Sequence, residues 1–422
     1  MSMNAVTPSL WRHSDFVRLW SAAGISGFGA RITREGLPLI AVMSLGASPA
    51  QVGVLAALSR GPALLVGLFA GGQIDRARKR PVLIAADIAR ALVLAAVPFG
   101  ALAGSINLVW VYVAAAVVGG ASAVFDIAHH AYLPSLIDRR QLVDGNAKLG
   151  QVDAVAEVGG PAIAGWLFQL LTAPVAIAVN AATYLASAFF LLVIRRPEPP
   201  PIEQPAAEHV LSDAMAGAGI ALRHPLVRPL ALMEITMALF GSFFSALYSL
   251  FALRVIGLTP GLLGMTIALG GIGGLIGAAV TPNLTRRFGV GPAMIGLASA
   301  GALFNLFIPL APSGAIAGAA SLGVAQLFGD ALLTGAFIIT GSLRQSLLPA
   351  EVLGRVGGAI SAASGLTGIC GALAGGWLAG VSSPRLILLI GALGILAATM
   401  LPLFSPLRAM RDLPATEAQS ET

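Results

Sequence analysis

Residues 64–104 read LLVGLFAGGQIDRARKRPVLIAADIARALVLAAVPFGALAG, which is two apolar runs on either side of a short, strongly basic loop. The first run begins near residue 52 and the second covers 82–104, so each is long enough for an α-helix to cross a hydrocarbon layer of about 30 Å. Inside lipid the backbone must satisfy its own hydrogen bonds, and these runs lack the two-residue alternation of a membrane β-barrel. The stretch therefore predicts two transmembrane helices joined by a loop at the membrane surface.

Composition extends this prediction to the whole chain. Of its 422 residues, 57% are hydrophobic and only 10% are charged, whereas about a quarter of the residues in a soluble domain are charged. The apolar runs predict an all-α membrane protein with twelve transmembrane helices. The expected spans lie near residues 16–43, 50–73, 82–103, 106–128, 147–171, 175–195, 228–254, 260–283, 292–311, 314–342, 354–380 and 385–404.

The basic residues indicate how the chain is oriented. The net charge of +6 does not point to nucleic acid, because the basic residues lie between apolar runs rather than on one soluble face. The odd-numbered connections hold only Arg254 and Arg385, whereas the even-numbered connections and both ends of the chain hold nearly all the others. Basic loops stay in the cytoplasm, so we expect both termini to be cytoplasmic. The abundance of Ala, Gly and Arg over Lys favours a bacterial protein, and hence the bacterial inner membrane.

The chain carries an internal repeat. Sliding the sequence against itself by 211 positions superposes a series of turn and packing residues in a single register. The superposed pairs are Ser48-Pro49 with Thr259-Pro260, Gly53 with Gly264, Pro81 with Pro292, Pro98 with Pro309, and Gly165-Trp166-Leu167 with Gly376-Trp377-Leu378. This spacing predicts two pseudo-symmetric six-helix bundles in the same orientation, the second a duplicate of the first.

The repeat and the proline-rich stretch after residue 196 predict the domain boundaries. We expect an N-terminal six-helix bundle over 1–195 and a cytoplasmic linker with a short amphipathic helix over 196–227. A C-terminal six-helix bundle over 228–404 and a cytoplasmic tail over 405–422 follow.

The basic loop after the second predicted span resembles the motif Gly-x-x-x-Asp-Arg-x-Gly-Arg-Arg/Lys of the major facilitator superfamily. Arg78 stands where the second glycine of that motif is usual. The matching residues are Gly71, Asp75, Arg76, Lys79 and Arg80. Together with the two six-helix halves, the resemblance implies the major facilitator fold and transport by alternating access.

Within this motif, Asp75 is the candidate for a conformational latch on the cytoplasmic side. A carboxylate in such a tight loop can cap the positive N-terminus of a facing helix, here near Arg355, while the loop's basic residues pair with acids on neighbouring helices. The alternative for Lys79 and Arg80 is a pure topology signal. In the second half Thr285 or Arg286 stands where the acid would fall, so that copy of the latch is weakened.

Two further segments, 131–149 and 157–165, resemble the branch that contains the enterobactin exporter, macrolide efflux proteins and transmembrane secretion effectors. Asp87 and Arg90 fit the same branch. The fifth predicted span also resembles the antiporter motif of drug:proton exchangers, with Gly160, Pro161 and Gly165 in place. A proline beside small residues permits a hinge, or serves close helix packing alone.

Ionisable residues inside the spans are the candidate substrate and proton sites. A charged side chain near the bilayer centre costs at least a few kcal/mol, so it normally faces a wet cavity or a partner. The candidates are Arg31, Arg34, Glu35, Arg60, Asp153, Glu157, Glu234 and Asp330.

Each of these candidates has a structural alternative. Arg31, Arg34 and Glu35 share one helical face, where Glu35 can pair with Arg31 or the group can contact substrate or protons. Arg60 could neutralise Glu35 or bind an anionic group of the substrate. Asp153 and Glu157 lie one turn apart, so either one of the two carboxyls holds a proton or the pair bonds to the latch loop. Glu234 and Asp330 contact a proton or substrate, or pair with Arg31, Arg34 or Arg60.

These features predict a secondary active transporter, a proton-coupled exporter of a small amphipathic molecule such as a drug, siderophore or other secondary metabolite. An uptake or lipid-moving carrier of the same fold, or a membrane sensor or enzyme, are the alternatives. The chain has no phosphate-binding Gly-x-x-x-x-Gly-Lys-Ser/Thr, and His129 and His130 lack a third ligand. We therefore expect no cofactor, no metal and no catalytic residues. The expected partners are a small-molecule substrate, protons and the lipid bilayer, bound by a monomer.

Overall fold

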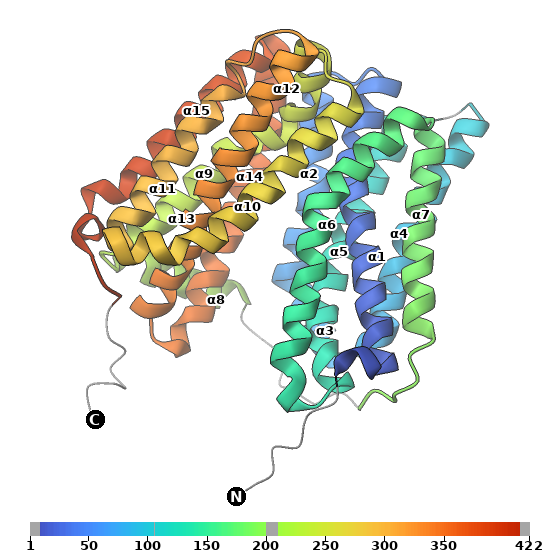
Figure 1. The fold of residues 1–422 in the computed structure, drawn as a ribbon, viewed down its shortest axis with the longest axis horizontal. Helices are drawn as coiled ribbons and strands as arrows, with labels where there is room; N and C mark the ends of the chain where they lie inside the picture. Colours follow the sequence, from blue (N-terminus) through green and yellow to red (C-terminus); the bar gives the residue numbers. More distant parts are fainter. Residues whose placement is uncertain (1–8, 105, 200–209, 414–422) are drawn as a thin grey trace, which may run out of the picture. The chain divides into compact units, whose positions relative to one another are not determined.

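The computed structural model describes residues 9–104, 106–199 and 210–413 of the 422-residue chain. Throughout these residues the regular structure is helical, without a β-strand (Figure 1). The prediction of an all-α membrane fold is confirmed.

The helices follow the predicted spans with small shifts at their ends. In the first half they are α1 (Ser14–Leu39), α2 (Pro49–Leu65), α3 (Gly71–Arg76), α4 (Lys79–Leu102), α5 (Leu108–Leu136), α6 (Leu142–Leu170) and α7 (Ala173–Leu192). The remainder are α8 (Val210–Arg223), α9 (Val227–Leu250), α10 (Pro260–Phe288), α11 (Val290–Phe304), α12 (Ala315–Val324), α13 (Asp330–Leu347), α14 (Ala350–Val381) and α15 (Pro384–Met400). Short π-helical turns join α2 to α3 and α12 to α13, at Val66–Ala70 and Ala325–Gly329.

Length and hydropathy identify the membrane-spanning helices. Among the described residues, ten helical segments are long and apolar enough to cross a membrane. α1 and α6 are not among them, although they are 26 and 29 residues long, and they carry most of the charged residues of the candidate site. With these two helices, the structure is compatible with the twelve predicted spans.

A shared corner in the two halves supports the internal repeat. α1 and α9 both run into a π-helical turn, at Ile40–Ser44 and Phe251–Ile256. Each turn is followed by a glycine with positive φ, 66° at Gly46 and 85° at Gly257, a conformation that side chains with a Cβ rarely adopt. These glycines are 211 positions apart, the spacing found in the sequence.

Hydrogen bonds and caps at this corner repeat as well. The Ala47 amide donates to the Ala41 carbonyl at 2.8 Å, and 211 positions later Leu258 donates to Ala252 at 2.9 Å. The next helix then starts with Ser48-Pro49 or Thr259-Pro260, in which the hydroxyl accepts an amide three residues on. The two halves therefore fold this corner in the same way.

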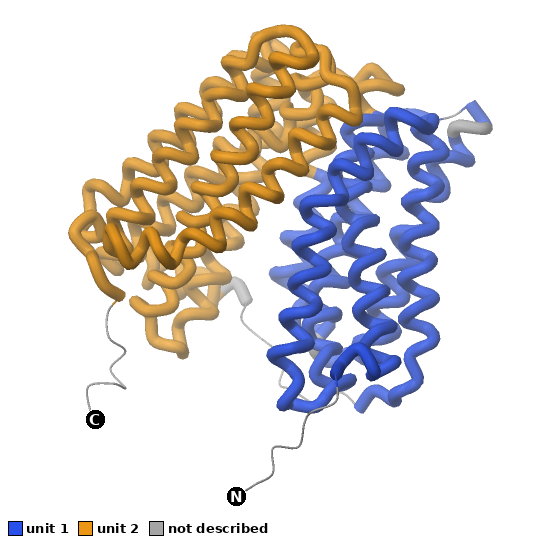
Figure 2. The backbone as a smooth tube through the Cα atoms, viewed as in Figure 1, with its two compact units in different colours: residues 1–40, 58–207 blue, residues 41–57, 208–422 orange. Residues whose placement is uncertain are grey.

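The described helices cluster into two compact units (Figure 2). Unit 1 consists of residues 1–40 and 58–207, and unit 2 of residues 41–57 and 208–422. In unit 1, α1 packs on α6 and α7, and α4 packs on α5 and α7. In unit 2, α9 packs on α14 and α15, and α13 packs on α10 and α11.

Residues 41–57 belong to unit 2 because of two contacts. Gly53 lies against α14, where an added Cβ would come within 2.6 Å of the Ala372 carbonyl oxygen and 2.9 Å of the Gly376 Cα. The Arg254 guanidinium donates to the carbonyls of Val42 and Ala47 at 2.7 and 2.8 Å. Residues 41–57 are therefore attached to the second half of the sequence by the close contact of Gly53 with Gly376 and by the hydrogen bonds of Arg254.

Candidate functional site

A cluster of ion pairs joins α1 to α6 in unit 1. Nε and Nη2 of Arg31 donate to Oε2 of Glu157 at 2.7 and 2.6 Å. Nη2 of Arg34 donates to Oε1 of the same carboxylate at 2.8 Å, and its Nε donates to Glu35 at 3.1 Å. Glu157 thus binds two arginines, and Glu35 pairs with Arg34. The expected pairing of Glu35 with Arg31 is wrong, because Arg31 turns toward α6 instead of along its own helix.

Gly160 allows Arg31 this position. A Cβ added at Gly160 would overlap the Cβ of Arg31, so a larger residue would push α1 and α6 apart. α6 runs without a break from Leu142 to Leu170, through the buried Pro161 and Gly165. The structure gives Gly160 a packing role next to the charged cluster, while the hinge at Pro161 stays a prediction.

The ion-pair cluster is partly exposed. The side chains of Arg34 and Glu157 are 49% and 42% exposed, and those of Arg31 and Glu35 are 28% and 14% exposed. Glu157 lies near the middle of α6, at a depth where a charge facing lipid would cost several kcal/mol. We therefore expect the exposed side of the cluster to face water rather than lipid.

Arg60 stands beside this cluster on α2. Its side chain is exposed, and the structure gives it no hydrogen bond or ion pair with any residue it describes. The charged group acting on it is Arg34, another cation, and the expected neutralisation of Glu35 by Arg60 is not formed. Next to Arg60, α2 touches α5 at Gly119, where a Cβ would overlap the Ser59 carbonyl.

Further acids extend the cluster along α5 and α6. Asp153 lies within electrostatic range of Arg31, His130 and Glu157. Asp126 is within range of Arg31 and Asp153, and its carbonyl is hydrogen-bonded to Nδ1 of His130 at 2.8 Å. Asp153 therefore belongs to the same charged network as Glu157, as the sequence predicted for residues one helical turn apart.

A second, buried ion pair lies in the core of unit 1. Asp87 and Arg90 of α4 are 0% and 1% exposed and form an ion pair of 2.5 Å. Arg90 also donates to Ser26 of α1 at 3.0 Å and to Ser122 of α5 at 3.3 Å. The sequence analysis did not include this pair among the site residues, although opposite charges three residues apart in an apolar span were a visible signal.

Aromatic rings complete the environment of Arg90. Its guanidinium carbon lies 4.6 Å from the ring centre of Phe125 on α5 and 4.4 Å from that of Tyr184 on α7. Cation–π contact partly compensates for the lost hydration of a buried guanidinium. Arg90 therefore connects α4 to each of the helices that pack around it in unit 1.

In unit 2, the acids Glu234 and Asp330 each face residues of the same unit. Glu234 of α9 accepts from Arg344 of α13 at 3.2 Å, so its pairing cation is Arg344 and not Arg31, Arg34 or Arg60. Asp330 begins α13 directly after the π-helical turn Ala325–Gly329. It faces Gly270 of α10, where a Cβ would overlap its carboxylate.

The motif loop ties helices together inside unit 1. Arg80 donates to the carbonyls of Leu191 and Leu192 at the end of α7, at 2.9 and 2.6 Å. In return, the amides of Lys79 and Arg80 at the start of α4 donate to the carboxylate of Glu198. Arg80 thus binds carbonyls where the sequence predicted acids, because the C-terminus of a helix is itself negative.

The remaining latch residues give less information. The side chain of Asp75 lies outside the described part of the structure, so its latch role stays a prediction. Gly71 has open space around it, and the Arg76 guanidinium is half-buried in α3. Arg355 belongs to α14, and its carbonyl touches α8 at Gly217, where a Cβ would overlap it.

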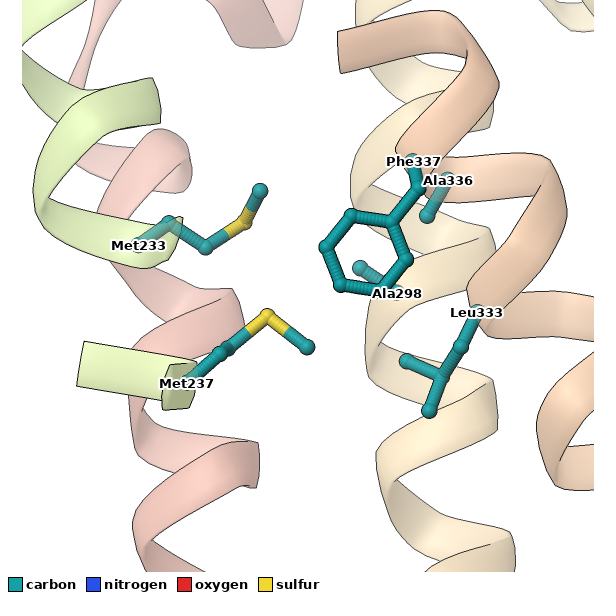
Figure 3. Close-up of a pocket in the computed structure, with 6 residues that line it drawn as sticks. All are labelled: Met233, Met237, Ala298, Leu333, Ala336 and Phe337. Atoms are coloured by element: carbon teal, nitrogen blue, oxygen red, sulfur yellow. The ribbon is translucent and has the colours of Figure 1, made fainter. Parts of the chain in front are cut away.

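A small pocket in unit 2 has only apolar walls. Met233 and Met237 of α9 point toward Leu333 and Phe337 of α13 (Figure 3). Ala298 and Ala336 complete the lining. Because no charged or hydrogen-bonding side chain lines it, this pocket is part of the core packing and offers no means of orienting a polar ligand.

The chain is similar to known membrane transporters. A model of the Major Facilitator Superfamily matches residues 19–369. The chain is 25% identical over 395 residues to the uncharacterized MFS-type transporter YfiS of Bacillus subtilis, covering 88% of each. It is 28% identical over 299 residues to the multidrug efflux pump Tap of Mycolicibacterium fortuitum, covering 68% of this chain and 73% of Tap. The crystal structure of a bacterial homologue of the iron transporter ferroportin, in an inward-facing state, superposes with a TM-score of 0.72 at 20% identity, covering 94% of this chain and 99% of that one.

Proposed function

Because the chain belongs to the Major Facilitator Superfamily, we propose that it is a proton-coupled exporter that moves a small amphipathic molecule across the membrane by alternating access. The similarity to the efflux pump Tap supports the export direction. The charged network of α1 and α6 supports proton coupling, since a transporter needs a titratable group that water reaches at membrane depth.

The observation that carries the proposal is the position of Glu157. Both of its oxygens bind arginines of α1, and its side chain is 42% exposed. Protonation would remove the charge that holds Arg31 and Arg34, and so would weaken the attachment of α1 to α6. A proton and a rearrangement of two helices would thereby be coupled through one carboxyl group.

Glu35 and Asp330 are the next candidates for the proton carrier. Glu35 shares Arg34 with Glu157. Protonation of one acid would leave Arg34 paired with the other alone, which strengthens that ion pair. Asp330 is half-buried in unit 2, beside the π-helical turn that precedes α13. π-Helical turns occur frequently at functional sites, which supports Asp330 as an alternative carrier.

The test uses purified protein in proteoliposomes with an imposed proton gradient. A drug panel on cells with and without the protein selects the compound to be followed. We expect Glu157→Gln to abolish gradient-driven export of this compound while its binding stays measurable. Asp144→Asn is the matched control, since Asp144 lies on the same helix, is 54% exposed and pairs with Lys148.

Two results would contradict this proposal. Unchanged pH dependence of export in the single variants Glu35→Gln, Glu157→Gln and Asp330→Asn would exclude proton coupling through these groups. Accumulation of the compound in the opposite direction under the same gradient would identify an uptake carrier instead.

A further inference from the structure

Arg60 is a charged residue of the site that the ion pairs leave unbalanced. Arg31 and Arg34 share the carboxylates of Glu157 and Glu35, whereas the charge acting on Arg60 comes from a second guanidinium, Arg34. Two like charges in proximity repel each other, and a lone guanidinium at membrane depth is costly unless water or an anion surrounds it.

The protein's own acids do not supply that anion. Both oxygens of Glu157 already accept from arginines, and Glu35 accepts from Arg34. Asp153 and Asp126 act on Arg31, and neither is among the charges that act on Arg60. Within the described part of the chain, Arg60 therefore presents an exposed guanidinium whose five donors are available.

We propose that Arg60 binds an anionic group of the transported molecule, a carboxylate or a phosphate, and that this group lies between Arg60 and Arg34. This inference rests on the proposed transport function and names the class of its substrate, an amphipathic anion. The planar guanidinium donates two parallel hydrogen bonds to such a group, and the anion removes the repulsion between Arg60 and Arg34.

The local backbone makes Arg60 suitable for this task. The Ser59 carbonyl, next to Arg60, lies against Gly119 of α5, so the side chain of Arg60 extends from a helical position in contact with α5. A binding group held on a packed helix is positioned more accurately than one on a loop. When the anion leaves, only water replaces it, so binding does not require a protein ion pair to be broken at Arg60.

The experiment measures binding by titration calorimetry to purified protein in lipid nanodiscs. The probes share one apolar ring system: 2-naphthoate, 2-naphthyl phosphate, the neutral 2-naphthamide and the cationic 2-naphthylmethylammonium. We expect at least one of the two anions to bind at least tenfold more tightly than the amide. Arg60→Gln should remove this preference, and Arg60→Lys should keep part of it, since lysine retains the charge but not the paired donors.

The control is Arg140→Gln, which removes an exposed arginine far along the chain from the cluster and should bind all four probes like the parent protein. Thermal unfolding of each variant checks that it is folded, and Arg60→Lys keeps the test valid if Arg60→Gln does not fold. Binding of the two anions no tighter than the amide, their failure to bind at millimolar concentration, or a preference that survives in Arg60→Gln would each overturn the inference.

The same variants in proteoliposomes separate this inference from the proposed function. Gradient-driven transport of the amide or the ammonium compound, unchanged by Arg60→Gln, would overturn the anionic substrate class while leaving transport intact. Transport of an anionic probe that is lost in Arg60→Gln but kept in Arg140→Gln would support both.

Discussion

At the scale of single residues, the charged site depends on which arginine of α1 reaches which carboxylate. Arg31 and Arg34 both bind Glu157 of α6, and Arg34 also binds Glu35 beside it in the sequence. The partner of Arg31 is 126 residues away in the chain, and the pairing depends on how closely α1 approaches α6. Helical periodicity specifies which residues share a face, whereas a contact between two helices depends on packing that one segment does not reveal.

The ion pair between Asp87 and Arg90 allows a prediction about stability. Asp87→Ala leaves a buried guanidinium without its counter-ion, and we expect a loss of about 3–5 kcal/mol in the free energy of unfolding. Replacing both residues, as in Asp87→Leu with Arg90→Met, should cost much less, because no unpaired charge then remains. Denaturant titration in detergent micelles measures both effects.

The comparison for this prediction is Asp144, an exposed carboxylate that pairs with Lys148. Asp144→Ala should change the free energy of unfolding by at most about 1 kcal/mol, since its side chain is 54% exposed. If Asp87→Ala were no more destabilising than Asp144→Ala, the buried pair would not support unit 1 as described.

At the scale of elements, small residues decide which helices touch. Gly160 lets α1 reach α6, Gly119 lets α2 reach α5, and Gly53 lets α2 reach α14. Gly160 could be singled out from the sequence by its position beside Pro161, but its contact with Arg31 is visible only in the structure. The partners of Arg80 could not be predicted for the same reason. They are carbonyls at the end of α7, which is distant from Arg80 in the sequence.

Gly160→Val tests the crossing of α1 and α6. The added side chain should displace Arg31 from Glu157 and lower the free energy of unfolding by about 1–3 kcal/mol, as overpacking does. If Glu157 couples protons, the variant should also shift the pH dependence of export in proteoliposomes. Gly150→Val is the control on the same helix, since open space surrounds Gly150. Equal stability and equal transport in the two variants would mean that the crossing does not position the cluster.

At the scale of the whole molecule, the sequence predicted the fold class and the repeat well. Both depend on patterns that every helix carries, namely its length, its apolar composition and the spacing of its turn residues. The grouping of residues 41–57 with unit 2 could not be predicted, because it depends on the approach of Gly53 to Gly376. The division of the chain into bundles over 1–195 and 228–404 stays a prediction.

The orientation in the membrane can be tested by cysteine labelling. In a Cys370→Ser background, we expect Gln204→Cys and Ser420→Cys to react with membrane-impermeant maleimide only after the cells are opened, since both positions are predicted to be cytoplasmic. Ser313→Cys, at an exposed position of the loop between α11 and α12, should react in intact cells. Labelling of position 204 or 420 in intact cells would reject this topology.

The corner after α1 and α9 also carries historical information. A π-helical turn is rare, and here it recurs with its glycine, its hydrogen bond and its capping hydroxyl at the same register in both halves. Independent origin would require several matching changes at one position in each half. The more economical history is that an ancestral six-helix protein already had this corner, and that one gene duplication copied it. The corner is therefore older than the two-bundle transporter that now contains it.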